Sequence, residues 1–232
     1  MREDRGALVA GGTGALGIEV VRELLDAGYA VTAPWILERE KERAEASFPP
    51  GSSKLTLVRA DLMEPGAAAD VVEGVDGLQA VVNLVGGFSS GPKVHETEPD
   101  DFDHMLRLNL RPGFLLARAA MPRLVDAGGG AYVGVSARPA LRPFAGAAGY
   151  ITAKAAVLAF VQALDADYRD DGVRCNAILP SVIDTPANRA AMPDADHSKW
   201  VPPEQIAKVI RFLVSDDSAP TSGAAIPVYG RA

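Results

Sequence analysis

The sequence predicts an α/β fold in which a doubly wound parallel sheet is covered by helices on both faces. Short apolar runs alternate with helical patterns along the chain, as they do in proteins with a parallel sheet. A glycine-rich turn, Gly11–Gly17, lies directly between the first apolar run and the first helical pattern. Because no linker or internal repeat divides the chain, these features predict a single Rossmann-type domain over residues 1–232.

The first half of the chain predicts three strand–helix units. Apolar runs predict strands at Ala7–Ala10, Tyr29–Ala33 and Leu55–Arg59. Helical patterns predict helices at Leu16–Ala27, which stops at Gly28, at the charged stretch Glu38–Ala46, and at Ala67–Val75.

The second half continues the same alternation. The strongly apolar run Leu78–Val85 predicts a buried central strand that ends at Gly86-Gly87. The stretch Asp101–Ala127 is long enough for a helix with a break near Pro112-Gly113. Two more helices are predicted, at Gly149–Tyr168 and Pro203–Ser215. The remaining strands are predicted at Ala131–Val135, Val173–Leu179 and Ile226–Tyr229.

Composition narrows the possible functions. A net charge of −7 argues against a sequence-independent hold on nucleic acid or on an anionic membrane. The only cysteine, Cys175, excludes an intrachain disulfide and lies in an apolar run that predicts a buried, inert thiol. The three scattered histidines show no ligand spacing, so no metal site is expected. With no signal peptide and no run of 18 apolar residues, we expect a cytoplasmic protein that acts on a small molecule.

The glycine-rich turn predicts a dinucleotide site. Glycines at a strand–helix junction let the backbone approach a pyrophosphate closely, and the free N–H groups of the following helix point at the anion. We therefore expect the cofactor NAD or NADP to contact Gly11, Thr13, Gly14, Ala15, Leu16 and Gly17.

The end of the second strand leaves the choice between the two cofactors open. An acidic residue usually binds the adenosine ribose at this place, but here the chain has Trp35 and no acid before Glu38. Trp35 is expected to stack against the ribose or adenine, or to be packed in the fold. A 2′-phosphate would not be repelled, and Arg39 or Lys41 could reach it.

The motifs, taken in order, resemble the short-chain dehydrogenase/reductase family over nearly the whole chain. They are the glycine-rich turn, Asp61-Leu62, Asn83 with Val85 and Gly86, Asn109, the pair Tyr150 and Lys154, and Asn176 through Thr185. The resemblance implies that Asp61 and Leu62 flank the adenine. It also implies cofactor contacts for Asn83, Val85, Gly86, Pro180, Ile183 and Thr185. Asn83 could equally stitch the sheet together.

Tyr150 and Lys154 are the expected catalytic pair. Residues four apart on a helix share a face, so both can address one pocket. A nearby ammonium favours the phenolate, which would bring the pKa of the tyrosine toward the working range. The resemblance implies that Lys154 also holds the nicotinamide ribose and that Asn109 anchors a water in the proton path.

The family usually has a catalytic serine before its tyrosine, and this chain lacks a serine at that position. The resemblance places it thirteen residues before the tyrosine, where this chain has Ala137, and Ser136 is its neighbour. Ser136 is a catalytic candidate if the loop rearranges, although a one-residue slip at a strand end turns a side chain the other way.

The missing serine is shared with the dihydropteridine reductases, which this chain also resembles in the glycine-rich turn Gly11–Gly17 and in three further segments. These are Gly86–Gly91, Leu179–Trp200 and Pro220–Gly223. Such enzymes reduce quinonoid dihydropterins, whose ring accepts hydride with little polarisation of a carbonyl. Trp35 and Phe88 depart from the pattern of those enzymes.

Two functions follow from these residues. The first is an NAD(P)-dependent oxidoreductase that transfers hydride between nicotinamide and a small carbonyl or quinonoid compound. The second is a non-catalytic NAD(P)-binding redox sensor. The presence of Tyr150, Lys154 and Asn109 favours the enzyme. The resemblance further implies a homodimer or homotetramer that pairs the helices predicted at Asp101–Ala127 and Gly149–Tyr168.

Overall fold

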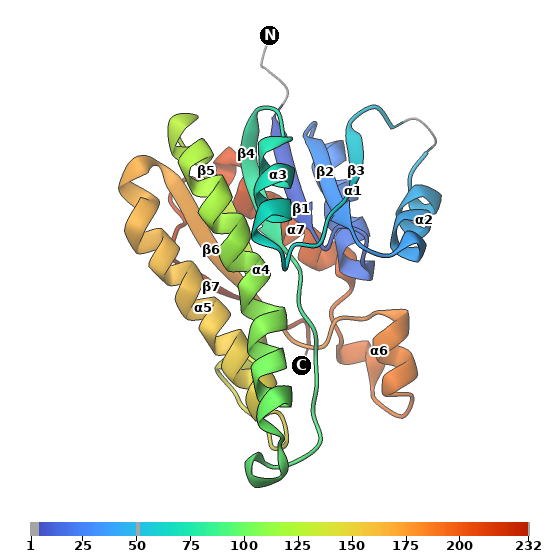
Figure 1. Cartoon of the computed structure of the whole chain (residues 1–232). Helices are drawn as coiled ribbons and strands as arrows, with labels where there is room; N and C mark the ends of the chain where they lie inside the picture. The colour runs from blue at the N-terminus through green and yellow to red at the C-terminus, as the bar shows by residue number, and fades with distance from the viewer. Residues whose placement is uncertain (1–4, 50–51, 232) are drawn as a thin grey trace.

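A seven-stranded, all-parallel sheet forms the centre of the computed structural model, which describes residues 5–49 and 52–231 (Figure 1). The strand order is β3-β2-β1-β4-β5-β6-β7, which confirms the predicted doubly wound α/β fold. The strands are β1 (Gly6–Ala10), β2 (Ala30–Trp35), β3 (Leu55–Arg59), β4 (Leu78–Asn83), β5 (Gly130–Val135), β6 (Val173–Pro180) and β7 (Ala225–Val228).

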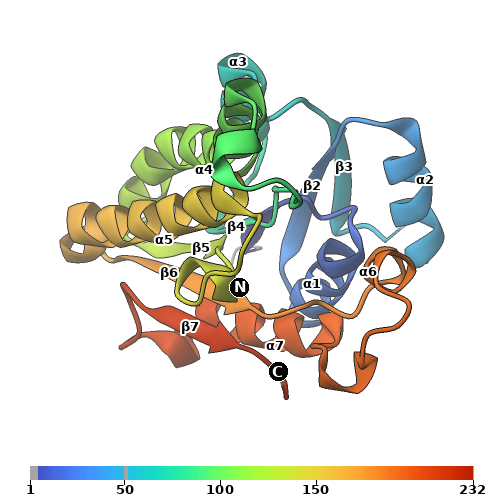
Figure 2. The same cartoon turned by 90° about the horizontal axis from the view of Figure 1, so that it is seen from below.

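Helices cover both faces of the sheet (Figure 2). One face carries α1 (Ala15–Asp26) and α7 (Pro203–Val214), and the other carries α3 (Pro65–Glu73), α4 (Pro99–Asp126) and α5 (Ala148–Tyr168). The charged helix α2 (Glu38–Ser47) lies beside the outer strands, and the short α6 (Pro186–Ala191), which the sequence did not predict, lies near the carboxyl edge. Among the described residues, no helix is both long and apolar enough to cross a bilayer.

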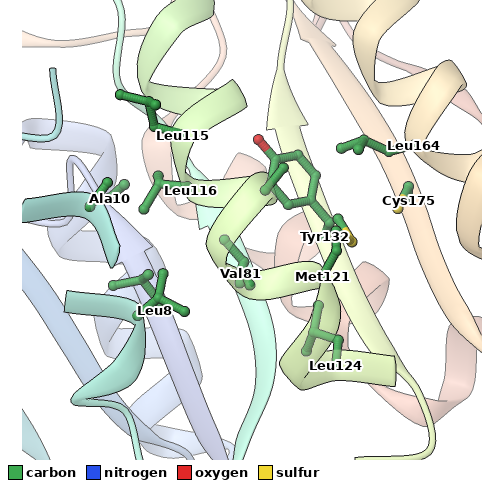
Figure 3. Close-up of a cluster of buried hydrophobic side chains, with 14 of the residues drawn as sticks. Leu8, Ala10, Val81, Leu115, Leu116, Met121, Leu124, Tyr132, Leu164 and Cys175 are labelled. Carbon is green, nitrogen blue, oxygen red and sulfur yellow. The ribbon is translucent and has the colours of Figure 1, made fainter. Parts of the chain in front are cut away.

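Two apolar layers hold the sheet to its helices. On the α4 side, Leu8, Val81, Leu116, Met121 and Tyr132 are each at most 1% exposed and pack together (Figure 3). Cys175 lies in the same layer and is fully buried, as predicted. A second layer under α1 and α7 is built from similar aliphatic side chains, among them Val9, Val21, Leu24, Ile206 and Ile210.

The predicted break near Pro112-Gly113 in the helix Asp101–Ala127 is wrong. Helix α4 runs without interruption through Pro112, which lacks the N–H of a normal helical residue. At the next residue, the Tyr132 hydroxyl donates to the Gly113 carbonyl oxygen at 3.2 Å, which connects this part of α4 to β5. A Cβ on Gly113 would lie 2.7 Å from Nδ2 of Asn83, so the glycine lets the helix approach the sheet.

The strand order reverses between β1 and β4. From β1 the chain winds outward through β2 and β3, then returns to the other side of β1 with β4. In parallel sheets the crevice at such a reversal, outside the carboxyl ends of the strands, binds ligands. The loops after β1 and β4 both open on this edge, which Figure 2 views end-on.

Candidate active site at the carboxyl edge of the sheet

The glycine-rich turn joins β1 to α1 at this edge. Gly11 has a φ of +78°, which glycine adopts without strain. A Cβ on Gly17 would lie 2.0 Å from the Gly11 carbonyl oxygen, so only glycine lets α1 pack this closely on the turn. Gly14 caps α1 without a side-chain hydrogen bond, and helix geometry leaves the N–H groups of Ala15 and Leu16 without intrahelical acceptors. This cradle fits a pyrophosphate.

Arg43 of α2 reaches the same turn. Its Nε donates to the carbonyl oxygen of Thr13 at 2.7 Å, and Thr13 is only 4% exposed. The contact fixes a guanidinium beside the proposed phosphate cradle. The sequence pointed to Arg39 and Lys41 instead, because a contact between residues thirty apart leaves no local pattern.

Trp35 is the last residue of β2, and two positively charged side chains lie beside its ring. Nζ of Lys41 lies 5.7 Å from the centroid of its ring, and Cζ of Arg59 lies 5.9 Å from it. Lys41 is itself paired with Glu38 at 3.4 Å. Within residues 5–49 and 52–231, the buried Nε1 of Trp35 has no hydrogen-bond partner. Because Nε1 is buried, the part of Trp35 that lies near the carboxyl edge is its ring, with Lys41 and Arg59 beside it.

The predicted adenine-flanking residues lie directly after β3. Asp61 is exposed, and its Oδ1 accepts from the Met63 N–H at 2.9 Å. Leu62 is 5% exposed, and its side chain belongs to the apolar layer on the α4 side. The structure therefore places Asp61 at the carboxyl edge, whereas the Leu62 side chain points into the core.

Asn83 serves the fold at the end of β4. Its Oδ1 accepts from the Val85 N–H at 3.2 Å, and its Nδ2 lies against Gly113 of α4. The side chain is 4% exposed, which matches the sheet-stitching interpretation. The predicted strand ended at Val85, but the observed one ends at Asn83, although the Leu84 N–H still donates to the Ala10 carbonyl oxygen of β1 at 2.9 Å.

Three predicted catalytic residues, Asn109, Lys154 and Tyr150, lie close to Gly86. A Cβ there would lie 2.5 Å from Oδ1 of Asn109 and 3.0 Å from Nζ of Lys154. Asn109 is 1% exposed and receives the Gly87 N–H at 3.2 Å. The ammonium of Lys154 donates to the Val135 carbonyl oxygen at 3.0 Å and lies 6.0 Å from the ring centroid of Tyr150. Residues from the loop after β4, from α4 and from α5 therefore lie close together.

Burial shifts the pKa values of both Tyr150 and Lys154. It raises the pKa of Tyr150 to about 12 and lowers the pKa of Lys154 to about 8. The sequence led us to expect a lowered pKa for Tyr150. In the structure, desolvation of the buried phenol raises this pKa instead. A phenol with this pKa carries its proton at neutral pH.

Ser136 does not join this group. Its hydroxyl donates to the Lys154 carbonyl oxygen at 2.7 Å, and the residue is 1% exposed. The side chain is thus used to attach the end of β5 to α5. Its neighbour Ala137 is 5% exposed and begins the loop that leads to Tyr150.

The segment after β6 closes one side of the edge. Pro180 is the last residue of β6, and Ile183 forms an isolated parallel bridge with Val201. The Thr185 hydroxyl caps α6 by accepting from the Asn188 N–H at 3.2 Å. All three residues follow β6 or end it, and the Thr185 oxygen already has a hydrogen-bond partner within the protein.

Two aromatic side chains beside Tyr150 were missed as site residues. Phe88, from the loop after β4, lies with its ring centroid 4.9 Å from that of Tyr150, at an interplanar angle of 81°. Phe144, from the loop before α5, lies 6.5 Å from Phe88. In the sequence, the only indication for Phe144 was its position just before the helix predicted at Gly149–Tyr168.

The chain matches relatives along its full length. It is 29% identical to a 2-(R)-hydroxypropyl-CoM dehydrogenase of Xanthobacter autotrophicus, over 97% of each chain. It is 28% identical to a (3R)-3-hydroxyacyl-CoA dehydrogenase of Rattus norvegicus, over 97% of this chain and 94% of that one.

Solved structures have the same fold. A blue fluorescent protein from a metagenomic library, in complex with NADPH, is 26% identical over 98% of each chain, with a TM-score of 0.87. ElxO with NADP bound superposes with a TM-score of 0.91 over 98% of each chain at 21% identity. The model of the family described as short chain dehydrogenase matches residues 5–196. The chain therefore belongs to the short-chain dehydrogenase family of NAD(P)-dependent oxidoreductases.

Proposed function

We propose that this enzyme reduces a small cyclic carbonyl or quinonoid compound with NADPH, and that Tyr150 is the proton donor. The convergence of Tyr150, Lys154 and Asn109 around Gly86 carries the proposal. The experiment is steady-state oxidation of NADPH and NADH with a panel of quinonoid, cyclic and linear carbonyl compounds. Tight binding of NADPH without turnover of any compound would support the redox-sensor alternative.

The roles follow from the contacts. The cofactor supplies the hydride when it is bound. Tyr150, protonated at neutral pH, supplies the proton to the substrate oxygen. Lys154 has an ammonium fixed on the Val135 carbonyl oxygen and further N–H donors for a ribose hydroxyl. Asn109 holds the Gly87 N–H and so shapes the loop that faces Tyr150.

NADPH is the proposed cofactor because of the charges around Trp35. Lys41 and Arg59 flank its ring, and Arg43 is fixed on the Thr13 carbonyl oxygen. These cations would attract a 2′-phosphate. β2 itself ends in Trp35, and a nearby carboxylate, that of Glu40, accepts from the Ile36 and Leu37 N–H groups at 3.0 and 3.1 Å. The metagenomic blue fluorescent protein was solved with NADPH, which agrees with this proposal.

Trp35→Asp is expected to shift the preference toward NADH by about tenfold or more. A carboxylate there would bond the ribose hydroxyls and repel a 2′-phosphate. The measurement is the ratio of kcat/KM for NADPH to kcat/KM for NADH, and Trp35→Phe is the control, since it removes the N–H without adding charge. An unchanged ratio in Trp35→Asp would place the adenosine ribose elsewhere.

The substrate class follows from Ala137. With the Ser136 hydroxyl held on the Lys154 carbonyl oxygen, no serine is left to polarise a substrate carbonyl at this position. An electron-poor ring, of which a quinonoid dihydropterin is one example, accepts hydride without that help. We therefore propose such rings as substrates in preference to simple ketones.

Ala137→Ser is expected to change quinonoid turnover by less than about threefold while raising the weak activity toward ketones. A hydroxyl at residue 137 adds polarisation that only the ketone needs. The comparison is kcat/KM for 1,4-naphthoquinone and for cyclohexanone in wild type and variant. Robust reduction of ketones by the wild type that disappears in Ser136→Ala would reverse these assignments.

The outer face of α4 and α5 is the proposed homo-oligomer interface. Phe114 of α4 is 48% exposed, and its ring centroid lies 6.2 Å from that of Phe160 on α5. Phe160 is partly buried, and exposed aromatic side chains such as Phe114 are common in interfaces between subunits. Analytical ultracentrifugation of wild type and Phe114→Glu tests for loss of a dimer or tetramer.

A further inference from the structure

Exposed aromatic surface borders the proton donor. Phe88 is 62% exposed and Phe144 is 45% exposed, although each ring is large and apolar. Their ring centroids lie 6.5 Å apart with the planes tilted by 39°, so the rings adjoin rather than enclose a gap. We call these two side chains the aromatic wall. Phe88 also makes an edge-type contact with Tyr150 at 4.9 Å.

The loop that carries Phe88 is fixed on both sides of the ring. Just before it, the Gly87 N–H donates to Oδ1 of Asn109 at 3.2 Å, and a Cβ on Gly87 would lie 2.6 Å from Leu108. Just after it, the Gly91 N–H donates to the carbonyl oxygen of Gly146 at 2.7 Å. Phe88 is therefore exposed on a braced loop, in a defined position.

The same brace positions Phe144. Gly146 follows it by two residues and has a φ of +79°. A Cβ on Gly146 would lie 2.7 Å from the Gly91 carbonyl oxygen, so glycine allows the two loops to touch. The loop after β4 and the loop before α5 thus present their rings together, next to Tyr150.

An exposed surface made of two aromatic rings favours a planar partner. Stacked and edge-to-face aromatic contacts add about 0.5–1.5 kcal/mol beyond the burial of area, and they need a planar π system. A puckered or linear compound of equal size gains the burial alone. Exposed aromatic rings that stay ordered beside reactive groups are consequently suited to select ligands by planarity.

We propose that Phe88 and Phe144 are specificity-determining residues that bind the flat ring of the substrate and hold its reducible carbonyl beside Tyr150. This inference rests on the proposed function, since it assigns a substrate feature to the same site. It goes beyond that function by naming the surface that selects planar over puckered rings.

The test measures binding apart from turnover. Dissociation constants of the flat probe 1-naphthol and the puckered probe cyclohexanol are measured by calorimetry on NADP⁺-loaded protein. Phe88→Leu and Phe144→Leu are each expected to weaken 1-naphthol binding by about three- to tenfold and to leave cyclohexanol binding nearly unchanged. Phe88→Trp, which keeps an aromatic ring at this position, should retain binding of 1-naphthol. Phe212→Leu, at a ring of α7 that is 42% exposed, is the matched control and should change neither constant.

Turnover gives a second readout. With 1,4-naphthoquinone and NADPH, Phe88→Leu should raise KM by about three- to tenfold with little change in kcat, because the wall binds ground state and transition state alike. Equal 1-naphthol affinity in wild type and the Phe88→Leu/Phe144→Leu double variant would overturn the inference, as would absence of binding to the wild type. Retained turnover in Tyr150→Phe would instead overturn the proposed function, and the binding result would still stand.

Discussion

Tyr150→Phe is expected to lower kcat by at least ~10²-fold, the usual contribution of a positioned acid. The substitution removes one hydroxyl and keeps the ring that contacts Phe88. Because the fold and the nucleotide cradle are untouched, the dissociation constant for NADPH should change little. The measurements are kcat with the best substrate of the panel and NADPH affinity by fluorescence titration.

The control for this prediction is Tyr168→Phe. Tyr168 is the last residue of the same helix and lies far along it from the carboxyl edge. That variant should keep wild-type kcat. If Tyr150→Phe keeps wild-type kcat as well, Tyr150 is not the proton donor.

Lys154→Met is expected to abolish measurable turnover and to make the protein more stable at pH 7. Burial lowers the pKa of Lys154 to about 8, below its value near 10.4 in an unfolded chain. Between these two pH values the unfolded state binds more protons, so the free energy of unfolding rises with pH through this window. Below pH 8 the buried ammonium destabilises the folded state.

Methionine keeps the bulk of the side chain and removes this penalty. It also leaves the Val135 carbonyl oxygen without its donor, which costs about 1 kcal/mol. The net gain at pH 7 should raise Tm by at least ~2 °C, and the rise in wild-type stability between pH 8 and 10 should be smaller in the variant. A lower Tm for Lys154→Met at pH 7 would contradict this account of the site.

Local sequence patterns predicted most of the fold. Strand–helix alternation and the position of the glycine-rich turn are local features, so the parallel sheet and the closeness of Gly17 to Gly11 could be anticipated. The spacing of Tyr150 and Lys154 placed them on one helix face in the same way. These arguments need only neighbours along the chain.

The misses come from contacts between distant residues. Pro112 stays inside α4, and the next residue, Gly113, packs on Asn83 and Tyr132 of the sheet. Leu62 belongs to the core, which its position after a strand did not reveal. The direction of a side chain at a strand end depends on the partner it finds, as Ser136 finds the Lys154 carbonyl oxygen.

The electrostatic surroundings of the site could not be predicted from the sequence either. The opposite pKa shifts of Tyr150 and Lys154 arise from burial by several elements at once. Arg59 lies beside Trp35 because β3 pairs with β2 in parallel, a register that the sequence does not state.

Transfer of isotope from the cofactor tests the central claim most directly. The wild type is incubated with 1,4-naphthoquinone or a cyclic carbonyl and with NADPH that carries deuterium at C4, each C4 epimer in turn, and the nicotinamide is analysed by mass spectrometry. The account predicts stoichiometric oxidation in which one epimer loses its deuterium and the other retains it. The carbonyl product should carry that deuterium on its former carbonyl carbon. NADPH that remains bound, unoxidised and fully labelled with every compound would contradict it and would favour a nucleotide sensor.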